Sequence, residues 1–245
     1  MKDREVDQDS AKPRPAPFVG RKRELAALAG ALRARRSCLV TGPLGIGKSR
    51  LVEEALCVAG QPFQRLARPR ALHDLLVDLA RRWPQPADSA DLRRTTSIAL
   101  KPLVLDALRT KPCCLVLEDM AAVEPRMYRF LQRVYYLPGV CLIVTAESRE
   151  ALGHLRKLLW DPREEIALKP LPAAEAAELF DAACQAYGLD AASIDEFRRK
   201  ALKTAEGHPG RILTMCRLAS RPEYWSGGRI RFLPVWIDAR MAFVS

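Results

Sequence analysis

Long apolar runs are absent from this sequence of 245 residues. No stretch approaches the roughly 20 apolar residues that a bilayer-spanning helix needs. The N-terminus, MKDREVDQDSAKPRPAP, is charged and proline-rich where a secretory signal would carry an apolar segment. We therefore expect a cytoplasmic protein that contacts no membrane, with a disordered tail over residues 1–16.

Motifs for metal or redox chemistry based on cysteine are also missing. The seven cysteines form no C-x-x-C pair and no Cys/His cluster, and their number is odd. Four of them lie in short apolar runs, namely Cys38, Cys113, Cys114 and Cys141. This placement is typical of reduced thiols in the core of a cytoplasmic protein.

A phosphate-binding loop is the most specific motif in the chain. The pattern G-x-x-x-x-G-K-[ST] is matched by Gly42, Pro43, Leu44, Gly45, Ile46, Gly47, Lys48 and Ser49, and Arg50 follows in the expected helix. The glycines let the backbone aim successive N–H groups at phosphates, and Lys48 adds a positive charge. The hydroxyl of Ser49 is placed to ligate Mg²⁺, and the N-terminus of the helix points at the same phosphates.

Strands and helices alternate through the first part of the chain. The apolar patterns predict five strands, at about 37–41, 62–66, 113–117, 140–145 and 165–168, with helices between them. The run at 113–117 is wholly apolar, as expected of a central parallel strand that is covered on both faces. The pattern predicts an α/β fold of the P-loop NTPase class (ASCE type), with a five-stranded parallel sheet flanked by helices.

Only helices are expected after Leu171. They are predicted at 173–187, 194–204 and 211–218, which makes a small helical lid subdomain that can close over a bound base and ribose. The last segment, residues 225–237, has a turn signal followed by an aromatic-rich run. It either packs back on the lid or serves as a partner-docking strand. The expected divisions are a tail at 1–16, an ATPase core at 17–171, a lid at 172–220 and an extension at 221–245.

Two carboxylates, Glu118 and Asp119, directly follow the central apolar run. Ligands bind at the carboxyl ends of the strands in open α/β sheets. In nucleotide hydrolysis one such carboxylate holds Mg²⁺ through its water shell, and its neighbour orients or deprotonates the attacking water. The alternative is that both cap the next helix, which begins near Pro125.

The ordered set of motifs resembles the AAA+-related STAND ATPases over roughly residues 17–220. The set consists of the segment 18–25, the loop 42–49, the run 115–119, the strand ending in Thr145 with Arg149 shortly after, and Gly207-His208-Pro209. The resemblance implies an ATP hydrolase that works as a nucleotide-driven switch with Mg²⁺. Its output would come from a protein partner or from self-assembly, because the chain is too short after the lid for an effector domain.

Residue roles follow from the resemblance position by position. It implies that Phe18, Val19 and Gly20 pack near adenine and that Pro209 of the lid packs against the nucleotide. It implies that Glu118 supports Mg²⁺ and that Asp119 polarises the attacking water. The sensor of the γ-phosphate is Thr145 or Arg149, and we favour Arg149.

The chain departs from the family pattern at the acidic pair. Family members place Asp first, whereas here Glu118 precedes Asp119. The longer side chain would crowd the Mg²⁺ shell, and the shorter one reaches the water less well. Slow hydrolysis, or binding of ATP with little turnover, is therefore an alternative to an efficient ATPase.

Positive charge is concentrated near the C-terminus. The formal net charge is +11, and residues 196–240 contain ten Lys or Arg against four Asp or Glu. Such an excess indicates a surface for nucleic acid or an acidic partner. An ordinary solvated helix face is the other interpretation, because no aromatic residues alternate with these charges. The alternative function is thus an ATP-gated adaptor that binds nucleic acid or a protein through this face.

Overall fold

The fold was examined in a computed structural model, which describes residues 18–69, 71–82, 92–190 and 194–243. The chain divides into two compact units. The sheet unit comprises Arg21–Lys169, and the helical unit comprises residues from Pro170 onward together with those up to Gly20.

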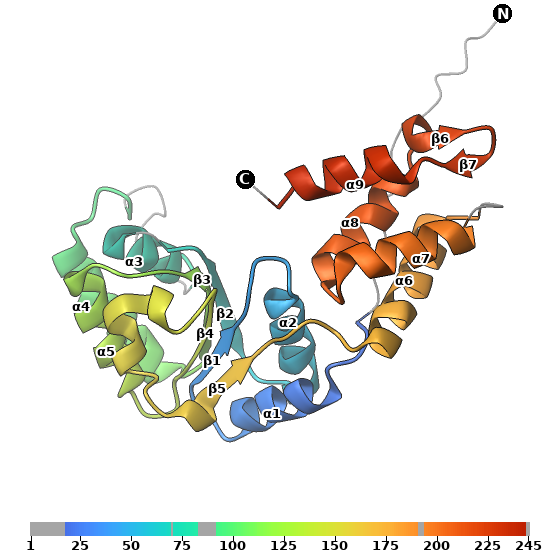
Figure 1. The fold of residues 1–245 in the computed structure, drawn as a ribbon. Helices are drawn as coiled ribbons and strands as arrows, with labels where there is room; N and C mark the ends of the chain where they lie inside the picture. Colours follow the sequence, from blue (N-terminus) through green and yellow to red (C-terminus); the bar gives the residue numbers. More distant parts are fainter. Residues whose placement is uncertain (1–17, 70, 83–91, 191–193, 244–245) are drawn as a thin grey trace, which may run out of the picture. The chain divides into compact units, whose positions relative to one another are not determined.

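The sheet unit is built on five parallel strands (Figure 1). These are β1 (Cys38–Thr41), β2 (Phe63–Ala67), β3 (Cys114–Met120), β4 (Cys141–Ala146) and β5 (Glu165–Ala167), in the order β2-β3-β4-β1-β5. The predicted fold class is confirmed. Strand β3, which lies between β2 and β4, extends three residues past the predicted run, so it carries both members of the acidic pair.

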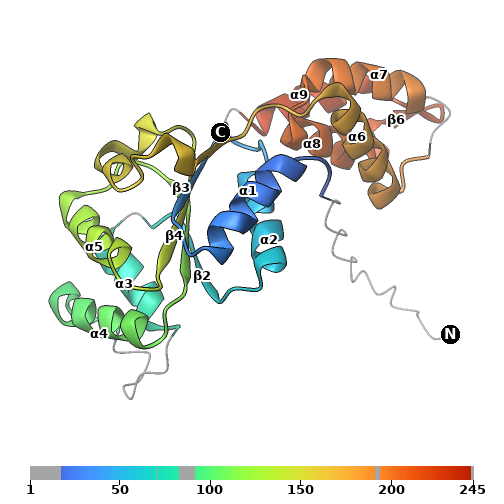
Figure 2. The same cartoon turned by 90° about the horizontal axis from the view of Figure 1, so that it is seen from below.

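Helices cover both faces of the sheet. On one face lie α1 (Lys22–Arg33) and α2 (Lys48–Ala59), and on the other lie α3 (Leu72–Ala80), α4 (Ser97–Thr110) and α5 (Pro125–Tyr135) (Figure 1, Figure 2). Short 3₁₀ segments at Glu150–Lys157 and Pro162–Glu164 connect β4 to β5. Local signals fix several ends: the hydroxyl of Thr96 caps α4, and Pro125 opens α5.

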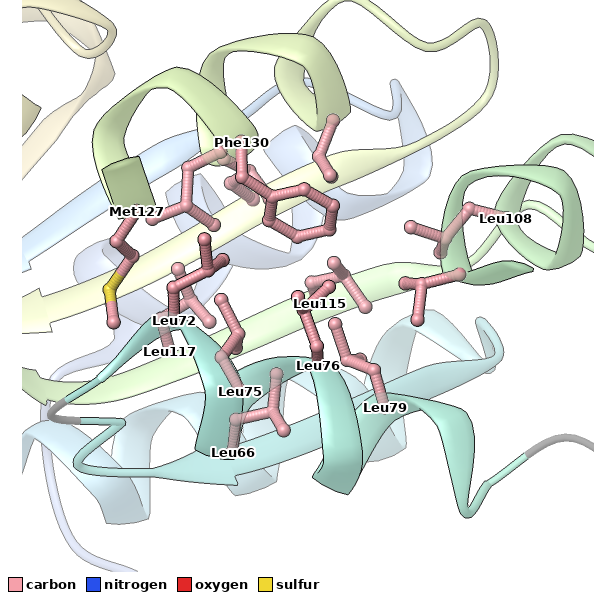
Figure 3. Packing of buried hydrophobic residues seen from close by; sticks show 14 of the residues in the cluster. Leu66, Leu72, Leu75, Leu76, Leu79, Leu108, Leu115, Leu117, Met127 and Phe130 are labelled. Atoms are coloured by element: carbon pink, nitrogen blue, oxygen red, sulfur yellow. The ribbon is translucent and has the colours of Figure 1, made fainter. Parts of the chain in front are cut away.

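Leucines make up most of the core between the sheet and α3, α4 and α5. Figure 3 shows side chains from β2, β3 and these three helices converging there: Leu66, Leu72, Leu75, Leu76, Leu79, Leu108, Leu115, Leu117, Met127 and Phe130. All ten are buried. Burying one such side chain stabilises the fold by about 1.5–3 kcal/mol, so this layer holds the strand ends, and the residues that follow them, in place.

The helical unit contains α6 (Ala173–Tyr187), α7 (Ile194–Ala205), α8 (Pro209–Ala219) and α9 (Phe232–Met241). A hairpin of β6 (Trp225–Ser226) and β7 (Arg229–Ile230) precedes α9. The interpretation of the aromatic-rich run as a strand is corrected, because most of that run forms α9, whose Val235 and Ala239 lie one turn apart in the core. The segment packs back on the helices.

Two side-chain hydrogen bonds hold this C-terminal segment. The hydroxyl of Tyr224 donates to Oδ2 of Asp238 at 2.6 Å, and Nε1 of Trp225 donates to the carbonyl of Ala219 at 2.7 Å. The first joins the start of the hairpin to α9, and the second joins the hairpin to the end of α8.

The cysteines match the expectation of reduced thiols. All seven are free, and the four named from the sequence are buried. In the described part of the chain, no helix has the length and apolar character needed to span a bilayer.

Candidate functional site

The phosphate loop lies between β1 and α2, at the carboxyl end of the sheet. Gly42 and Gly47 have φ angles of 148° and 101°, which side chains with a Cβ rarely adopt. A Cβ at Gly42 would also come within 3.0 Å of the carbonyl oxygen of Leu168. Gly47 is the N-cap of α2 and no side chain caps this helix, so its first N–H groups can bind an anion.

Lys48 is folded against the loop itself. Its Nζ donates to the carbonyl oxygens of Gly42 at 2.7 Å and Pro43 at 3.1 Å, and the residue is only 6% exposed. Burial lowers the pKa of Lys48, whereas the nearby carboxylates of Asp119 and Glu147 raise it. The ammonium group therefore already lies in the field of two carboxylates.

Arg21 supports the loop from the start of α1. Its Nη2 donates to the carbonyl of Ile46 at 3.0 Å and to that of Lys169 at 2.9 Å, and the residue is 6% exposed. This buried guanidinium ties α1 to the loop and to the end of β5. The fixed carbonyl of Ile46 keeps the neighbouring N–H groups of the loop oriented for a ligand.

A cavity of about 530 Å³ opens beside the loop. It has the size of a small-molecule site and lies where the strands end, which is where open α/β sheets bind ligands. Its lining combines both charges with small apolar side chains: Leu44, Lys48, Arg68, Pro69, Asp119, Met120, Ala121, Ala122, Val123, Glu147 and Ala151. Three of the residues named from the sequence, Leu44, Lys48 and Asp119, are thus brought together.

Asp119 is held in an unusual backbone conformation. Its φ is 47°, a left-handed value that costs roughly 1–2 kcal/mol in a residue with a Cβ. The N–H of Asp119 donates to Oγ1 of the fully buried Thr145 at 2.9 Å, and its Oδ2 accepts from Nε of Arg68 at 3.1 Å. The pairing of β3 with β4 shifts register between Leu117 and Met120. These contacts stabilise the strained backbone near the end of β3 that brings the Asp119 carboxylate into the cavity lining.

Glu118 lies outside the cavity lining. Its Oε2 and Oε1 accept from Nε and Nη2 of Arg65 on β2, at 2.7 and 2.8 Å, and the residue is 8% exposed. Nη1 of Arg65 also donates to Oε1 of Glu53 on α2 at 2.6 Å. The hydrogen bonds that Arg65 donates to Glu118 raise the pKa of Arg65. Both Glu118 oxygens are engaged, and the Mg²⁺ role implied by the resemblance stays a prediction.

The two sensor candidates also make contacts within the sheet unit. Arg149 donates from Nε to Glu165 at 2.7 Å and from Nη1 to the carbonyl of Leu159 at 2.6 Å. Glu165 accepts in turn from the hydroxyl of Thr41 at 2.8 Å. Thr145 is fully buried beneath Asp119. Neither Arg149 nor Thr145 lines the cavity, so the assignment of the sensor stays a prediction.

The positions that the resemblance places near adenine belong to the helical unit. Val19 packs against the core of that unit, and Gly20 has a φ of 71°, where a Cβ would collide with the carboxylate of Glu175. Pro209 is buried at the start of α8, and a ring nitrogen of His208 accepts from the N–H of Arg211 at 3.3 Å. Their nucleotide role stays a prediction.

Three charged residues were missed in the sequence. Arg68 directly follows β2, Glu147 directly follows β4, and Arg65 on β2 binds Glu118. The rule that selected the acidic pair, a polar residue at the carboxyl end of a strand, also selects Arg68 and Glu147. Arg65 could be found only from the register in which Arg65 pairs with Val116 and Ala67 with Glu118.

A family model described as AAA ATPase domain matches residues 17–215. The Walker-type ATPase paby2304 of Pyrococcus abyssi is similar in structure, with TM-score 0.65 and 17% identity over 95% of this chain and 75% of that one. The Orc1 protein of Aeropyrum pernix, solved in complex with DNA, has a TM-score of 0.64 and 16% identity over 93% of this chain and 66% of that one. The RuvB Holliday junction branch migration motor of Thermotoga maritima has a TM-score of 0.60 and 14% identity over 92% of this chain and 70% of that one. A search of curated proteins found no match.

Proposed function

The chain belongs to the AAA ATPase domain family, and from this premise we propose that it binds ATP with Mg²⁺ at the phosphate loop and hydrolyses it to ADP and phosphate. The observation that carries the proposal is the cavity of about 530 Å³ in which Lys48 and Asp119 meet. A cation for the phosphates and a carboxylate for the water are the two groups that this reaction needs from the protein.

The residues present fit a magnesium ion. Mg²⁺ prefers oxygen ligands and is usually held by one or two carboxylates together with phosphates and water. Ser49 is the second residue of α2, and Asp119 and Glu147 both line the cavity. When bound, Mg²⁺ would offset the negative charge that develops on the phosphates.

The protein's own groups would act as follows. Nζ of Lys48 leaves the carbonyls of Gly42 and Pro43 and pairs with the terminal phosphates, since these carry full negative charge. The N–H groups of the loop and of the first turn of α2 bind the same oxygens. Asp119, held by Thr145 and Arg68, accepts a hydrogen bond from the attacking water and orients it.

We further propose a nucleotide-driven switch of the STAND type, with residues 172–220 as the lid. Its support is the order of the motifs along the chain, from the segment 18–20 through the loop and the acidic pair to Pro209. The separate packing of the helical unit supports it as well, because that unit has a hydrophobic core of its own. A protein partner or a second copy of the chain would receive the signal.

The enzyme proposal is tested by phosphate release from the purified protein. We expect release that requires both ATP and Mg²⁺, measured at several protein concentrations and with and without DNA. Release that stays at background under all these conditions contradicts hydrolysis and leaves the adaptor function.

A second candidate function, an ATP-gated adaptor for nucleic acid, is favoured by a cavity of about 350 Å³ in the helical unit. Its lining includes Arg211, Trp236, Arg240 and Phe243, and the guanidinium of Arg240 lies 5.8 Å from the Trp236 ring centre. Aromatic rings beside arginines are the usual elements of single-strand binding. Of the similar structures, Orc1 was solved in complex with DNA, and RuvB is described as a Holliday junction branch migration motor.

The structure changes which basic residues should be tested. Arg198 binds both carboxylate oxygens of Asp181, and Lys200 pairs with Glu196, so these charges are partly neutralised. Arg211 and Arg240 make no ion pair within the described residues and face one cavity. These two arginines, which line the same cavity as Trp236, are therefore the first pair to test for nucleic-acid binding.

We predict that Arg211→Glu with Arg240→Glu weakens the binding of a labelled single-stranded oligonucleotide. If each arginine binds one phosphate, the salt slope should fall by about 1.4, because each contact on a single strand contributes about 0.7. Anisotropy titrations between about 50 and 200 mM salt measure it. The charge-matched control is Arg109→Glu with Lys157→Glu, two exposed residues of the sheet unit. Equal slopes in the two variants would exclude the cavity as a nucleic-acid site.

A further inference from the structure

Glu118 is bound to Arg65 through both of its carboxylate oxygens. The guanidinium covers both carboxylate oxygens, at 2.7 and 2.8 Å, and Glu53 holds it from the other side at 2.6 Å. The side chain of Glu118 is 10% exposed, so water cannot readily replace Arg65. Removing one partner of a buried ion pair is costly, because the other charge stays buried and unpaired.

Arg65 would also repel a divalent cation. Its guanidinium is always protonated, and a metal ion that shared the Glu118 carboxylate would sit beside this positive charge. The Arg65–Glu118 pair joins β2 to β3, and the Arg65–Glu53 pair joins β2 to α2. Glu118 therefore has the contacts of a residue that fastens the edge strand β2 to the sheet.

Glu147 has the features that Glu118 lacks. It follows β4 directly, lines the cavity together with Lys48 and Asp119, and its side chain makes no hydrogen bond or ion pair within the described residues. Its carbonyl accepts from the N–H of Gly42 at 3.1 Å, so its backbone is fixed to the start of the phosphate loop. A carboxylate attached to the loop in this way is positioned by the same backbone that binds the phosphates.

We propose that Glu147, with Ser49, holds the divalent cation that accompanies the bound triphosphate, and that Glu118 fastens β2 to β3 through Arg65. This inference rests on the proposed function and changes its residue assignment. Asp119 keeps the water, because the left-handed turn and Thr145 fix it separately. With Glu118 away from the cation, its side chain, which is longer than that of Asp, no longer has to fit into the ligand shell of Mg²⁺.

Matched Glu→Gln variants at positions 147 and 118 test the proposal. The probe is a fluorescent ATP analogue, and the measurement is the Mg²⁺ concentration at half-maximal analogue binding. We expect Glu147→Gln to raise this midpoint about tenfold or more, because the loss of even an outer-shell partner of a metal ligand lowers metal affinity by about 10–100-fold, and a group that holds the cation itself should matter at least as much. Glu118→Gln should leave the midpoint within about twofold and instead lower the melting temperature of the protein without nucleotide, because it breaks the pair with Arg65.

The outcomes separate the two levels of the proposal. A wild-type protein that binds no analogue at any Mg²⁺ concentration overturns the nucleotide function itself. A wild type that binds, with an unchanged midpoint in Glu147→Gln or with the large shift in Glu118→Gln, overturns only the new assignment. Melting without nucleotide shows that each variant folds. Should Glu147→Gln not fold, Glu147→Asp provides the test, since the shorter carboxylate must also raise the midpoint.

Discussion

Lys48→Ala is expected to abolish the stabilisation that ATP and Mg²⁺ give to the wild-type protein. Lys48 is the one lysine of the loop 42–49, and it lines the cavity, so its ammonium group is the positive charge that the loop offers to the phosphates. A ligand at 100 times its dissociation constant stabilises a protein by about 2.7 kcal/mol. The variant should show none of this gain at the same nucleotide concentration. Thermal melting with and without ATP and Mg²⁺ measures the difference.

The variant must be compared with its own nucleotide-free state. In the wild type, Nζ of Lys48 donates to the carbonyls of Gly42 and Pro43, so the substitution leaves both acceptors without this donor. The free protein can therefore melt lower for a reason unrelated to nucleotide. Lys157→Ala, at an exposed position of the same unit, is the matched control and should keep the full shift. If ATP and Mg²⁺ raise the melting temperature equally in Lys48→Ala and in the control, the loop is not the nucleotide-binding site.

The strands could be predicted because each is marked by a local pattern. The apolar run before the phosphate loop became β1, and the wholly apolar run at 113–117 became most of β3. The carboxyl end of β3 was not predictable in the same way. The left-handed backbone at Asp119 depends on Thr145, which is 26 residues away, and on Arg68, which directly follows another strand. No local pattern specifies contacts between strands that are distant in sequence.

Arg149 and Glu118 show the same limit for the site. From their positions after predicted strands, Arg149 was expected to contact phosphate and Glu118 the cation. The sequence correctly indicated that both lie near the carboxyl ends of the strands. Their side chains are bound by Glu165 and Arg65, which the pairing of β1 with both β4 and β5, and of β2 with β3, brings near. Strand-end position therefore predicts where a residue lies, whereas its partner depends on strand order and register.

The C-terminal run illustrates a different reason. Its turn signal and the aromatic-rich run that follows left two alternatives open, a segment that packs back on the lid or a partner-docking strand. In the structure Val235 and Ala239 face the core at helical spacing, and the hydroxyl of Tyr224 binds Asp238 on the same helix. Tertiary packing determined the conformation here, because strand propensity is a weak preference that burial easily outweighs.

Asp119→Asn is expected to abolish phosphate release while ATP binding is retained. A positioned general base contributes about 10²–10⁴ to the rate, so the variant should lose at least about a hundredfold in turnover. The amide has the shape of the carboxylate but lacks the charge that polarises water. Phosphate release and binding of the fluorescent analogue are measured on the same preparation.

The choice of asparagine makes this experiment specific. Asn tolerates the left-handed region, so a φ of 47° is kept without added strain, whereas Ala would be strained there. The backbone hydrogen bond to Thr145 does not involve the side chain and stays in place. The pair with Arg68 is lost, but the Arg68 side chain is 59% exposed, so this costs little stability. Asp106→Asn, which alters an exposed pair with Arg109, is the matched control.

The result also decides between the two candidate functions. If wild type and Asp106→Asn release phosphate and Asp119→Asn does not, while all three bind the analogue, then Asp119 has the water-orienting role in an enzyme. Turnover that survives in Asp119→Asn would assign the water to another group, and Glu147 would then be the remaining cavity carboxylate. Binding by all three with no release from any of them would contradict hydrolysis and leave the ATP-gated adaptor as the function.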